Sequence, residues 1–363
     1  MSQPGRRVPQ RVPGALVVAI LGTAMNPESI PGPDRPRPDS PSPDRPASDA
    51  GHPARLAVGI VGAGRAGTAL GVALARAGHE VVAASAVSDA SLRRARANFP
   101  GAAITEPDEV VRRSGLILLT VPDDALPGLV SGLAATGSPL EGRMLAHASG
   151  RYGVSVLEPA VRQGALPLAL HPVMTFTGRD DDVERLRGTC FGVTAPEVLR
   201  PAAEALVIEM GGEPVFIAEE YRDLYHAAIA GAANHLITLV AQGMDLLRMI
   251  GVAEPARMLA PLLSASLDNA LRFGDAGLTG PVARGDAATV AAHVAALEAM
   301  ASAPADAQGG SQAGAQGASG GASAAMVGAY VAMARLTADR ALAAGILRPA
   351  DAERLLGVLG GRP

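Results

Sequence analysis

Two patterns of apolar residues divide this chain. Between Arg55 and Ala218, short apolar runs alternate with longer segments in which apolar residues recur every three or four positions. Short runs bounded by turn residues predict strands, whereas the longer period predicts helices. The predicted strands are 56–61, 80–85, 102–105, 116–121, 144–147, 166–170, 190–194 and 214–217. The predicted helices between them are 68–77, a helix that starts at residue 91, and then 108–113, 125–133, 154–163 and 196–210.

Strands that alternate with helices in this way predict a doubly wound, mostly parallel sheet. From Glu219 onward no strand pattern remains, and long segments carry the helical period instead. These segments are 221–250, 255–271, 286–300 and 324–344. We therefore expect an α/β domain at residues 55–218, followed by an all-α C-terminal domain at residues 219–363.

Two segments carry neither pattern. Residues 1–54 combine an arginine-bearing start, a short apolar run and a proline-rich stretch, so we expect a disordered extension. Its apolar run, residues 15–25, is too short to span a bilayer. We interpret the extension as dispensable, or as the result of an upstream start codon, rather than as a signal peptide. Residues 301–323 are rich in Gly, Ala, Gln and Ser, and we expect a flexible loop between two helices.

The first predicted strand runs directly into a loop of the form G-x-G-x-x-G, made of Gly62, Ala63, Gly64, Arg65, Ala66 and Gly67. In such a loop the first glycine permits a tight turn, the second lets the backbone approach a pyrophosphate, and the third lets the helix pack on the sheet. The N–H groups that open the helix then bind the phosphates. Because Gly78 and a second strand complete a βαβ unit, the sequence predicts a Rossmann-type dinucleotide-binding domain.

The end of the second strand indicates which dinucleotide is bound. Ser85 stands where an acidic residue would hydrogen-bond a free ribose 2′-hydroxyl. Ser85 and Ser88, with Arg93 or Arg94, are suited instead to a 2′-phosphate, so we expect NADP(H) rather than NAD. Asp89 is the competing acid, but we interpret it as the cap of the following helix. The arginines can equally form a solvated helix face.

Further candidates lie at the ends of three later strands. Val121 ends the fourth strand and is followed by Pro122, His147 and Ser149 end the fifth, and His171 ends the sixth. Open α/β sheets bind ligands at the carboxyl ends of their strands. We therefore expect Val121 and Pro122 to line the nicotinamide site, and the other three to contact substrate. A turn at Pro122, and hydrogen bonds from the histidines to backbone carbonyls, are equally good interpretations.

The helical domain offers three more candidates. On a helix, His226 and Asn234 differ by about 80° in direction, so both can face one cleft. Polar groups on an apolar helix need partners, and a substrate would supply them. Arg284, in the loop before a predicted helix, is suited to a bidentate clamp on a substrate carboxylate. An interhelical hydrogen bond and a plain surface arginine are the alternatives.

Composition excludes several kinds of chemistry. A net charge of -4 and few aromatic residues argue against a nucleic-acid partner. All 31 basic residues are arginine, which excludes a lysine nucleophile or acid. The single cysteine, Cys190, lies in an alternating segment and is expected to be buried. We find no ligand spacing for a metal and predict none. We expect a cytoplasmic protein that does not enter a membrane.

Several segments together resemble a family of bacterial Rossmann-like proteins with a C-terminal helical domain of unknown function. They are the glycine loop, 120–123, 147–150, 171–176, 225–228, 234–235 and 279–286. The resemblance implies an NADP oxidoreductase, distantly related to ketopantoate reductase, pyrroline-5-carboxylate reductase and β-hydroxyacid dehydrogenases, with a helical dimerising domain. Ketopantoate reductases and β-hydroxyacid dehydrogenases place a catalytic lysine where this chain has Gly231. His226 is then our candidate proton donor, because histidine titrates near neutrality.

Two functions fit these residues. The first is reduction of a small oxo or imino acid by NADPH, with ketopantoate as one candidate, in a cleft between the domains of a homodimer. The second is a non-catalytic sensor that binds NADP(H) and contacts a partner protein. The missing lysine slightly favours the sensor, whereas the several polar groups expected at the crevice favour the enzyme. The resemblance to related Rossmann proteins leaves a deazaflavin hydride partner as a further alternative.

Overall fold

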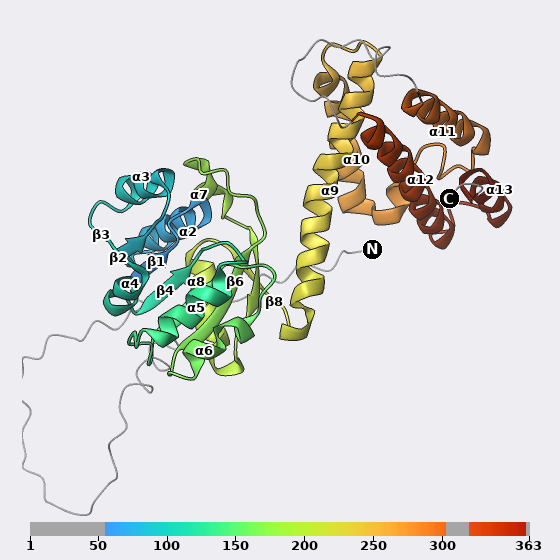
Figure 1. The fold of residues 1–363 in the computed structure, drawn as a ribbon. Coiled ribbons are helices and arrows are strands. Elements are labelled where there is room, and N and C mark those ends of the chain that lie inside the picture. The colour runs from blue at the N-terminus through green and yellow to red at the C-terminus, as the bar shows by residue number, and fades with distance from the viewer. Residues whose placement is uncertain (1–54, 303–318, 361–363) are drawn as a thin grey trace, which may run out of the picture. The chain divides into compact units, whose positions relative to one another are not determined.

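The computed structural model describes residues 55–302 and 319–360. The chain forms two compact units, which divide between Gly231 and Ala232 inside one long helix. The first unit is a sheet with helices on both faces, and the second is helical (Figure 1). An α/β fold followed by an all-α region is therefore confirmed. The extension predicted at 1–54, and most of the loop predicted at 301–323, lie outside the described residues.

Eight strands form one sheet in the order β3-β2-β1-β4-β5-β6-β7-β8. Neighbouring strands run parallel, except that β6 and β7 are antiparallel. The bounds are β1 Ala57–Val61, β2 Glu80–Ser85, β3 Ala103–Ile104, β4 Leu116–Leu119, β5 Met144–His147, β6 Leu166–Pro172, β7 Cys190–Thr194 and β8 Glu213–Phe216. The strand order reverses between β1 and β4, so their carboxyl ends border the crevice where such sheets bind ligands.

The helices and helical turns of the first unit connect these strands. They are α2 Arg65–Arg76, α3 Asp89–Asn98, α4 Pro107–Arg113, α5 Leu126–Ala135, η1 Val154–Leu157, α6 Glu158–Val161, α7 Asp181–Arg185, η2 Glu197–Leu199, α8 Arg200–Glu209 and η3 Glu219–Tyr221. The short helix α7 was not predicted, because its acidic sequence carries no apolar period.

Alternating side chains of the strands fill two separate cores. Leu116 and Leu118 of β4 pack with α2, α3 and α8, whereas Ile117 and Leu119 pack with α4 and α5. Because successive side chains of a strand point to opposite faces, a strand buried on both faces must be apolar throughout. This explains why the central strands read as continuous apolar runs.

The second unit has its own apolar core. Its helices are the remainder of α9 Arg222–Met249, α10 Pro255–Phe273, η4 Gly274–Gly277, α11 Ala287–Ala301, α12 Ser319–Ala343 and α13 Pro349–Gly360. Val290, Val294 and Leu355 are buried in a cluster built by α11, α12 and α13. The helix predicted from residue 324 begins at Ser319, and α13 was not predicted.

Two local predictions were wrong. Helix α3 begins at Asp89, and its cap is Ser88, whose hydroxyl accepts a hydrogen bond from the Ser91 backbone N–H at 3.2 Å. Ser91 bonds back to the Ser88 N–H, so a reciprocal capping box replaces the expected Asp89 cap. Cys190 is exposed rather than buried, since it opens β7 ahead of the strand residues that the helices cover.

Candidate functional site

The glycine loop fits tightly against the end of β4. Gly62 has a φ of +96°, and a Cβ there would lie 2.9 Å from the Thr120 carbonyl oxygen. A Cβ on Gly67 would lie 2.3 Å from the Thr120 Oγ1 and 2.5 Å from the Gly62 oxygen. Thr120 also donates a hydrogen bond from its hydroxyl to that oxygen at 2.8 Å. The first and third glycines are therefore required by the fold itself.

The second glycine has a different environment. Among the described residues, a Cβ on Gly64 would meet only the Gly62 oxygen, at 3.9 Å, so none of them excludes a side chain there. Gly64 is the N-cap of α2 and supplies no side-chain hydrogen bond, which leaves N–H groups of the first turn available. Open space in front of an uncapped helix N-terminus is the arrangement that a pyrophosphate needs.

The residues predicted to hold the adenosine end lie around the end of β2. The Ser85 backbone oxygen accepts hydrogen bonds from the N–H groups of Gly62 and Ala63, at 3.1 and 2.8 Å. Within the described residues, the Ser85 hydroxyl makes no hydrogen bond, whereas that of Ser88 is occupied by its cap. Ser85 is thus free to bind a ligand, and Ser88 is not. Arg93 lines a pocket that also contains Arg65 and Arg94.

Val121 and Pro122 form the β4 side of the same crevice. The Val121 Cγ1 lies 3.0 Å from the position that a Cβ on Gly62 would take, so the structure brings these two segments together. Pro122 accepts hydrogen bonds on its carbonyl from the N–H groups of Ala125 and Leu126, which begin α5. Pro122 therefore shapes a turn as well as bordering the crevice.

His147 and Ser149 are held by the protein itself. His147 is 1% exposed; its Nε2 is hydrogen-bonded to the Gly153 oxygen at 2.8 Å, and its Nδ1 accepts from the Ser149 N–H at 3.3 Å. The Ser149 hydroxyl accepts from the Tyr152 N–H at 3.2 Å. This geometry favours the alternative in which the histidine is satisfied by the backbone and fixes the loop after β5.

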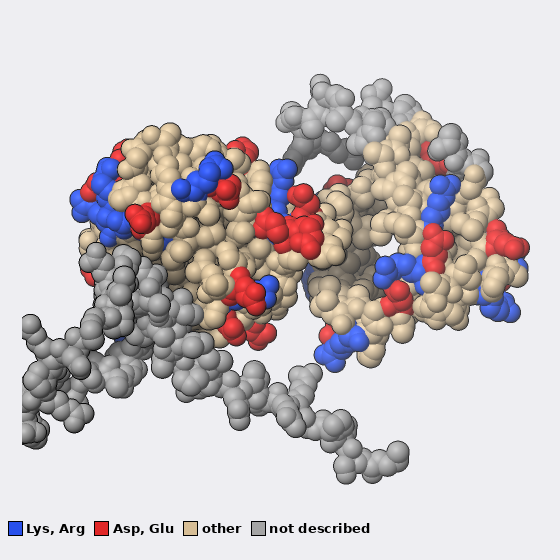
Figure 2. Space-filling model, turned by 90° about the horizontal axis from the view of Figure 1, so that it is seen from below, with Lys and Arg blue, Asp and Glu red and all other residues tan. Residues whose placement is uncertain are grey.

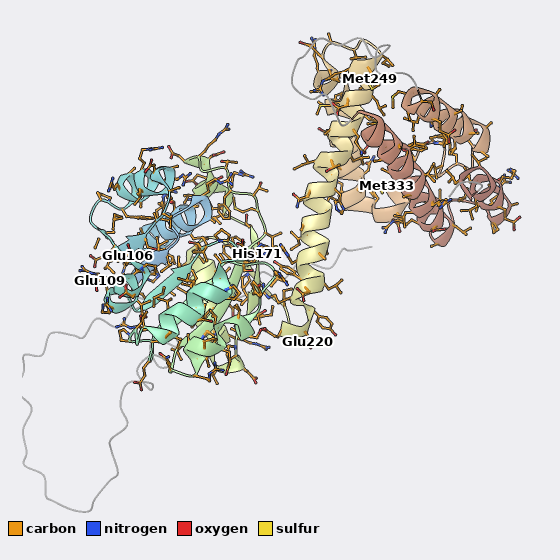
Figure 3. All side chains as sticks on the ribbon, in the orientation of Figure 1. Glu106, Glu109, His171, Glu220, Met249 and Met333 are labelled. Carbon is orange, nitrogen blue, oxygen red and sulfur yellow. The ribbon has the colours of Figure 1, made fainter. Side chains whose placement is uncertain are left out.

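His171 lies at the centre of a cluster that the sequence did not predict. It stands at the end of β6, as Figure 3 shows, and its Nδ1 is hydrogen-bonded to the Tyr225 hydroxyl at 2.8 Å. Its ring meets the His226 ring edge to face at 6.4 Å between centroids. A Cβ on Gly150 would lie 2.8 Å from the His171 Nε2 and 2.9 Å from the His226 Cδ2. The two histidines therefore converge on the loop after β5.

A buried arginine supports this cluster. Arg222, the first residue of α9, is 2% exposed. Its Nε donates to the Thr194 hydroxyl at 2.7 Å, and its Nη2 donates to the Gly192 oxygen at 3.0 Å. Its guanidinium lies over the Tyr225 ring at 5.5 Å. The Nη1 atom is the single buried side-chain polar atom without a partner in the described part of the chain, so a ligand or a water is needed to satisfy it.

Glu219 fastens the start of α9 to the loop after β5. Its carboxylate accepts hydrogen bonds from the N–H groups of Val154 and Ser155, at 2.7 and 3.0 Å. These N–H groups open the turn η1, so the carboxylate acts as a cap supplied by a distant segment. Hydrogen bonds to Ser155 and Val154 hold the pKa of Glu219 below its ordinary value, although burial opposes them. The loop that carries Gly150 and the cluster on α9 are thus fixed together.

Asn234 and Arg284 belong to the second unit. Asn234 is exposed on α9, and its backbone oxygen accepts from the Thr238 hydroxyl at 3.1 Å. Arg284 is exposed in the turn before α11, close to Asp286, whose carboxylate caps that helix by accepting a hydrogen bond from the Thr289 N–H at 3.1 Å. Their proposed contacts with substrate stay predictions. In residues 55–302 and 319–360, no group of three or more His, Cys, Asp or Glu side chains is placed to hold a metal ion.

Sequence reasoning assigned no role to Arg222, Tyr225 or Glu219. Each contacts a partner that is far away in the sequence, and the periodicity of apolar residues predicts no such pairing. His171 and Tyr225, for instance, lie 54 positions apart. The one signal in the sequence that could have indicated these residues is a run of charged residues at the start of an otherwise apolar helix. Such a run is expected both where a charged side chain caps the helix and where one is buried, so it does not identify Arg222.

The buried His147 and the partly buried His171 make the fold sensitive to acid. Burial, together with the nearby Arg222 cation, lowers the pKa of His147 and of His171 from 6.5 to about 4. Between pH 6.5 and pH 4 the unfolded chain binds protons at these histidines that the folded protein does not. Their contribution to the free energy of unfolding is therefore fully present above pH 6.5 and is lost as the pH falls toward 4. Each histidine accounts for about 3 kcal/mol at most.

We expect the urea midpoint to fall steadily from pH 7 to pH 5, and the fall to be smaller in His171→Gln. His293→Gln is the matched control, since His293 is exposed on α11. An equal pH dependence in all three proteins would contradict this account.

Comparison with known proteins identifies the class of protein to which this chain belongs. The chain matches a Rossmann-like domain over residues 42–172 and a domain of unknown function, DUF2520, over residues 189–308. It is 30% identical over 263 residues to a glycerol-3-phosphate dehydrogenase (NAD(P)+) of Bradyrhizobium sp. strain ORS 278, covering 64% of this chain and 78% of that protein. The corresponding protein of Thermus thermophilus is 28% identical over 236 residues, with 60% and 68% covered.

Solved structures share the fold. A Bacteroides fragilis protein, provisionally described as an NADP oxidoreductase, superposes with a TM-score of 0.60 at 20% identity, over 78% of this chain and 98% of that one. An imine reductase from Pseudomonas sp. gives 0.55 at 20% identity, over 84% and 100%. Fold, glycine loop and sequence relatives together define a member of the NAD(P)-dependent oxidoreductases. Within that class, the chain belongs to the family in which a Rossmann-like domain is followed by DUF2520.

Proposed function

We propose that this chain is an NADP-dependent reductase of a small oxo or imino acid, with ketopantoate as one candidate substrate. The observation that carries the proposal is the convergence of two things at the carboxyl edge of the sheet. One is the open, uncapped glycine loop, and the other is the His171, Tyr225 and His226 cluster above a buried Arg222. A dinucleotide site that served binding alone would not need such a cluster beside it.

In this proposal each part of the site has a defined task. When bound, the cofactor in its reduced form, NADPH, would supply the hydride. The N–H groups at the start of α2 hold its pyrophosphate, Ser85 with Arg93 holds its 2′-phosphate, and Val121 with Pro122 borders its nicotinamide. His147 and Ser149 keep the loop after β5 in place.

The remaining residues act on the substrate. The imidazolium form of His226 donates the proton that the reduced carbonyl or imine requires and becomes neutral imidazole, because the chain holds no lysine to act as the acid. His171, held by the Tyr225 hydroxyl, orients the substrate beside it. Asn234 positions the reacting group, and Arg284 binds the substrate carboxylate.

The test is calorimetric titration with NADPH and NADH, followed by the absorbance of NADPH mixed with ketopantoate and a panel of oxo and imino acids. We expect tight NADPH binding and oxidation of NADPH by at least one substrate. Tight binding with no turnover across the panel would favour the non-catalytic sensor, which the missing lysine also fits. Absence of binding to both nucleotides would refute the cofactor assignment.

We also propose that the protein is a cytoplasmic homodimer. Within the 31-residue segment 219–249, a stretch of 18 residues has a mean hydropathy of 1.3, enough by length and composition to cross a membrane. None of that stretch is buried within the single chain, so an exposed apolar face on α9 needs a partner. Large apolar side chains on α9, α10 and α12 are exposed: Leu236, Ile237, Leu239, Met249, Met258, Leu262, Leu267, Leu271, Met333 and Leu336. Figure 2 shows broad uncharged areas on the helical unit, and Figure 3 labels Met249 and Met333. A second copy of this chain would cover such a surface.

Light scattering after size exclusion in detergent-free buffer should give the mass of two chains. Ile237→Glu combined with Leu262→Glu should give the mass of one, because two charges would be buried unpaired in the interface. Val198→Glu, at a 73% exposed site on η2, is the matched control and should stay dimeric. A wild-type monomer, or a protein that needs detergent to stay in solution, would contradict the proposal.

A further inference from the structure

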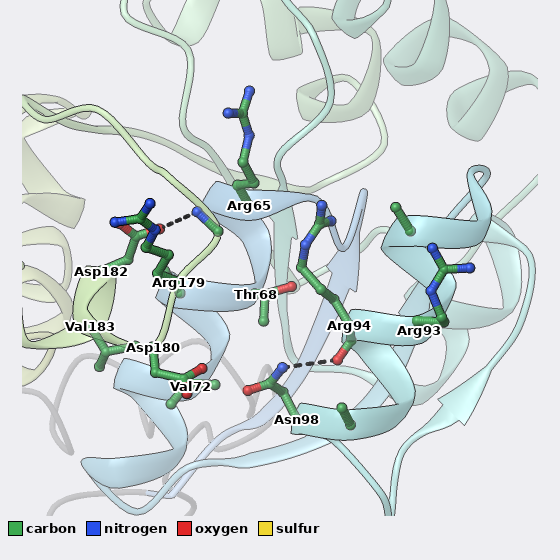
Figure 4. Close-up of a pocket in the computed structure, with 14 residues that line it drawn as sticks. Arg65, Thr68, Val72, Arg93, Arg94, Asn98, Arg179, Asp180, Asp182 and Val183 are labelled. Carbon is green, nitrogen blue, oxygen red and sulfur yellow. Dashed lines mark hydrogen bonds between the residues drawn. The ribbon is translucent and has the colours of Figure 1, made fainter.

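An arginine-lined pocket of about 470 Å³ lies between α2, α3 and the segment that follows β6. Arg65 comes from the start of α2, Arg93 and Arg94 come from α3, and Arg179 comes from the segment 178–183. Figure 4 shows Arg65 between Arg179 on one side and Arg94 on the other. Three parts of the chain that are distant in sequence therefore bring four cations to one pocket.

Within the described part of the chain, these four arginines are not paired with acidic side chains. Among the described residues, none of the four guanidinium groups makes a hydrogen bond or an ion pair, whereas neighbouring arginines of the same unit do. Arg76, for example, binds Glu184 at 2.6 Å, and Arg112 binds Glu109 at 2.7 Å. Like charges held together without counterions are unfavourable, so the pocket is suited to an anion.

The acids at the pocket do not neutralise it. Asp182 is buried and accepts hydrogen bonds from the Thr177 hydroxyl and from the N–H groups of Thr177 and Gly178, at 2.7 to 3.1 Å. Its carboxylate therefore holds the segment in shape, and these hydrogen bonds keep its pKa low although burial opposes them. Among the described residues that line the pocket, the exposed Asp180 is the one acid left to offset four arginines.

Gly178 holds the arginines close to one another. It has a φ of +81°, and a Cβ there would lie 2.9 Å from the Arg65 Cγ and 3.6 Å from the Arg94 Nε. The backbone of the segment thus passes directly beside both side chains. The helix faces between them carry small residues, Thr68 and Ala69 on α2 and Ala90 and Ala97 on α3, which leave the space open.

We propose that this pocket binds a phosphomonoester and that Arg179 is the residue that completes it, beyond the Ser85 and Arg93 contacts assigned above. Arg65 and Arg94 supply the other charges, and guanidinium groups from different segments can surround the phosphate oxygens bidentately. The phosphate is either the 2′-phosphate of bound NADP, which rests on the proposed function, or that of a separate small molecule. In the first case Arg179 determines the preference for NADP over NAD.

The test compares wild type with Arg179→Ala and Arg94→Ala, and uses Arg96→Ala as the matched control. Arg96 is exposed on the same helix as Arg94 and does not line the pocket. NADPH and NADH are titrated calorimetrically, and inorganic phosphate is titrated into each protein with and without saturating NADPH. Thermal unfolding checks that each variant folds. We expect Arg179→Ala to fold, because the Arg179 side chain is exposed and makes no hydrogen bond or ion pair within the described residues.

If the phosphate belongs to the cofactor, Arg179→Ala will weaken NADPH about tenfold or more and leave NADH unchanged, because one charge-assisted contact is lost. If it belongs to a separate ligand, NADPH affinity will be unchanged, and inorganic phosphate will bind the NADPH-saturated wild type but not Arg179→Ala. Equal behaviour of Arg179→Ala and Arg96→Ala in both titrations would overturn the proposal. Failure of the wild type to bind either nucleotide would refute the reductase, while the phosphate titration would still test the pocket.

Discussion

Gly64→Asp should abolish NADPH binding in a protein that is as stable as the wild type. The fold tolerates a side chain at this position, because a Cβ would meet no atom of the described residues closer than 3.9 Å and the backbone is extended, with φ -75° and ψ -159°. Aspartate is also among the best N-cap residues, so α2 loses nothing. Its carboxylate, however, would occupy the space of the pyrophosphate and take its hydrogen bonds. We expect affinity to fall by at least about 100-fold, or roughly 2.8 kcal/mol.

Two further variants distinguish the effect of side-chain size on NADPH binding from that of charge, and both from a loss of stability. Gly64→Ser adds bulk and a cap without a charge, so its loss of NADPH affinity should lie between those of wild type and Gly64→Asp. Gly67→Ala should instead reduce the stability of the fold. Its Cβ would press on Thr120 and on the Gly62 backbone, and we expect a loss of about 1–3 kcal/mol in the free energy of unfolding. Unchanged NADPH affinity in Gly64→Asp, measured by calorimetry, would mean that the dinucleotide does not bind at this loop.

The sequence predicted the sheet well, because its signals are local. The central strands are buried on both faces and therefore had to be continuous apolar runs, as Leu116–Leu119 shows. The start of α3 was mistaken for a different reason. Ser88 and Asp89 are adjacent residues that both make good caps, and composition alone does not decide between them. Cys190 is exposed although it lies in an alternating segment. An alternating pattern predicts a strand but does not indicate which of its residues are covered by helices.

The candidate site was predictable only in part. The glycine loop is a contiguous motif with a mechanical reason for each glycine, so its residues and its place at the sheet edge could be inferred. His171 and His226 were expected near a ligand, but nothing local indicates that Tyr225 would hold one of them, or that Arg222 would be buried beneath. Long-range pairs of this kind depend on the exact crossing of β6 and α9, which a pattern of polar and apolar residues does not encode.

His226→Ala should lower kcat by about 100-fold to 10,000-fold while leaving NADPH affinity within about twofold, because a general acid acts on the chemical step and not on cofactor binding. The decrease in rate toward high pH that an acid catalyst produces should also disappear in this variant. His235→Ala is the control, since His235 is exposed nine positions later on the same helix. It should retain wild-type kcat and the wild-type pH profile.

Tyr225→Phe tests whether His226 or Tyr225 is the proton donor. This variant removes the hydroxyl that holds His171 at 2.8 Å but keeps the ring that lies beneath the Arg222 guanidinium. If Tyr225 only positions His171, kcat and KM should change modestly and the pH profile should keep its shape. If Tyr225→Phe instead removes the decrease at high pH while His226→Ala retains turnover, the proton comes from the phenol. Burial raises the pKa of Tyr225, so that decrease would then lie at a correspondingly higher pH.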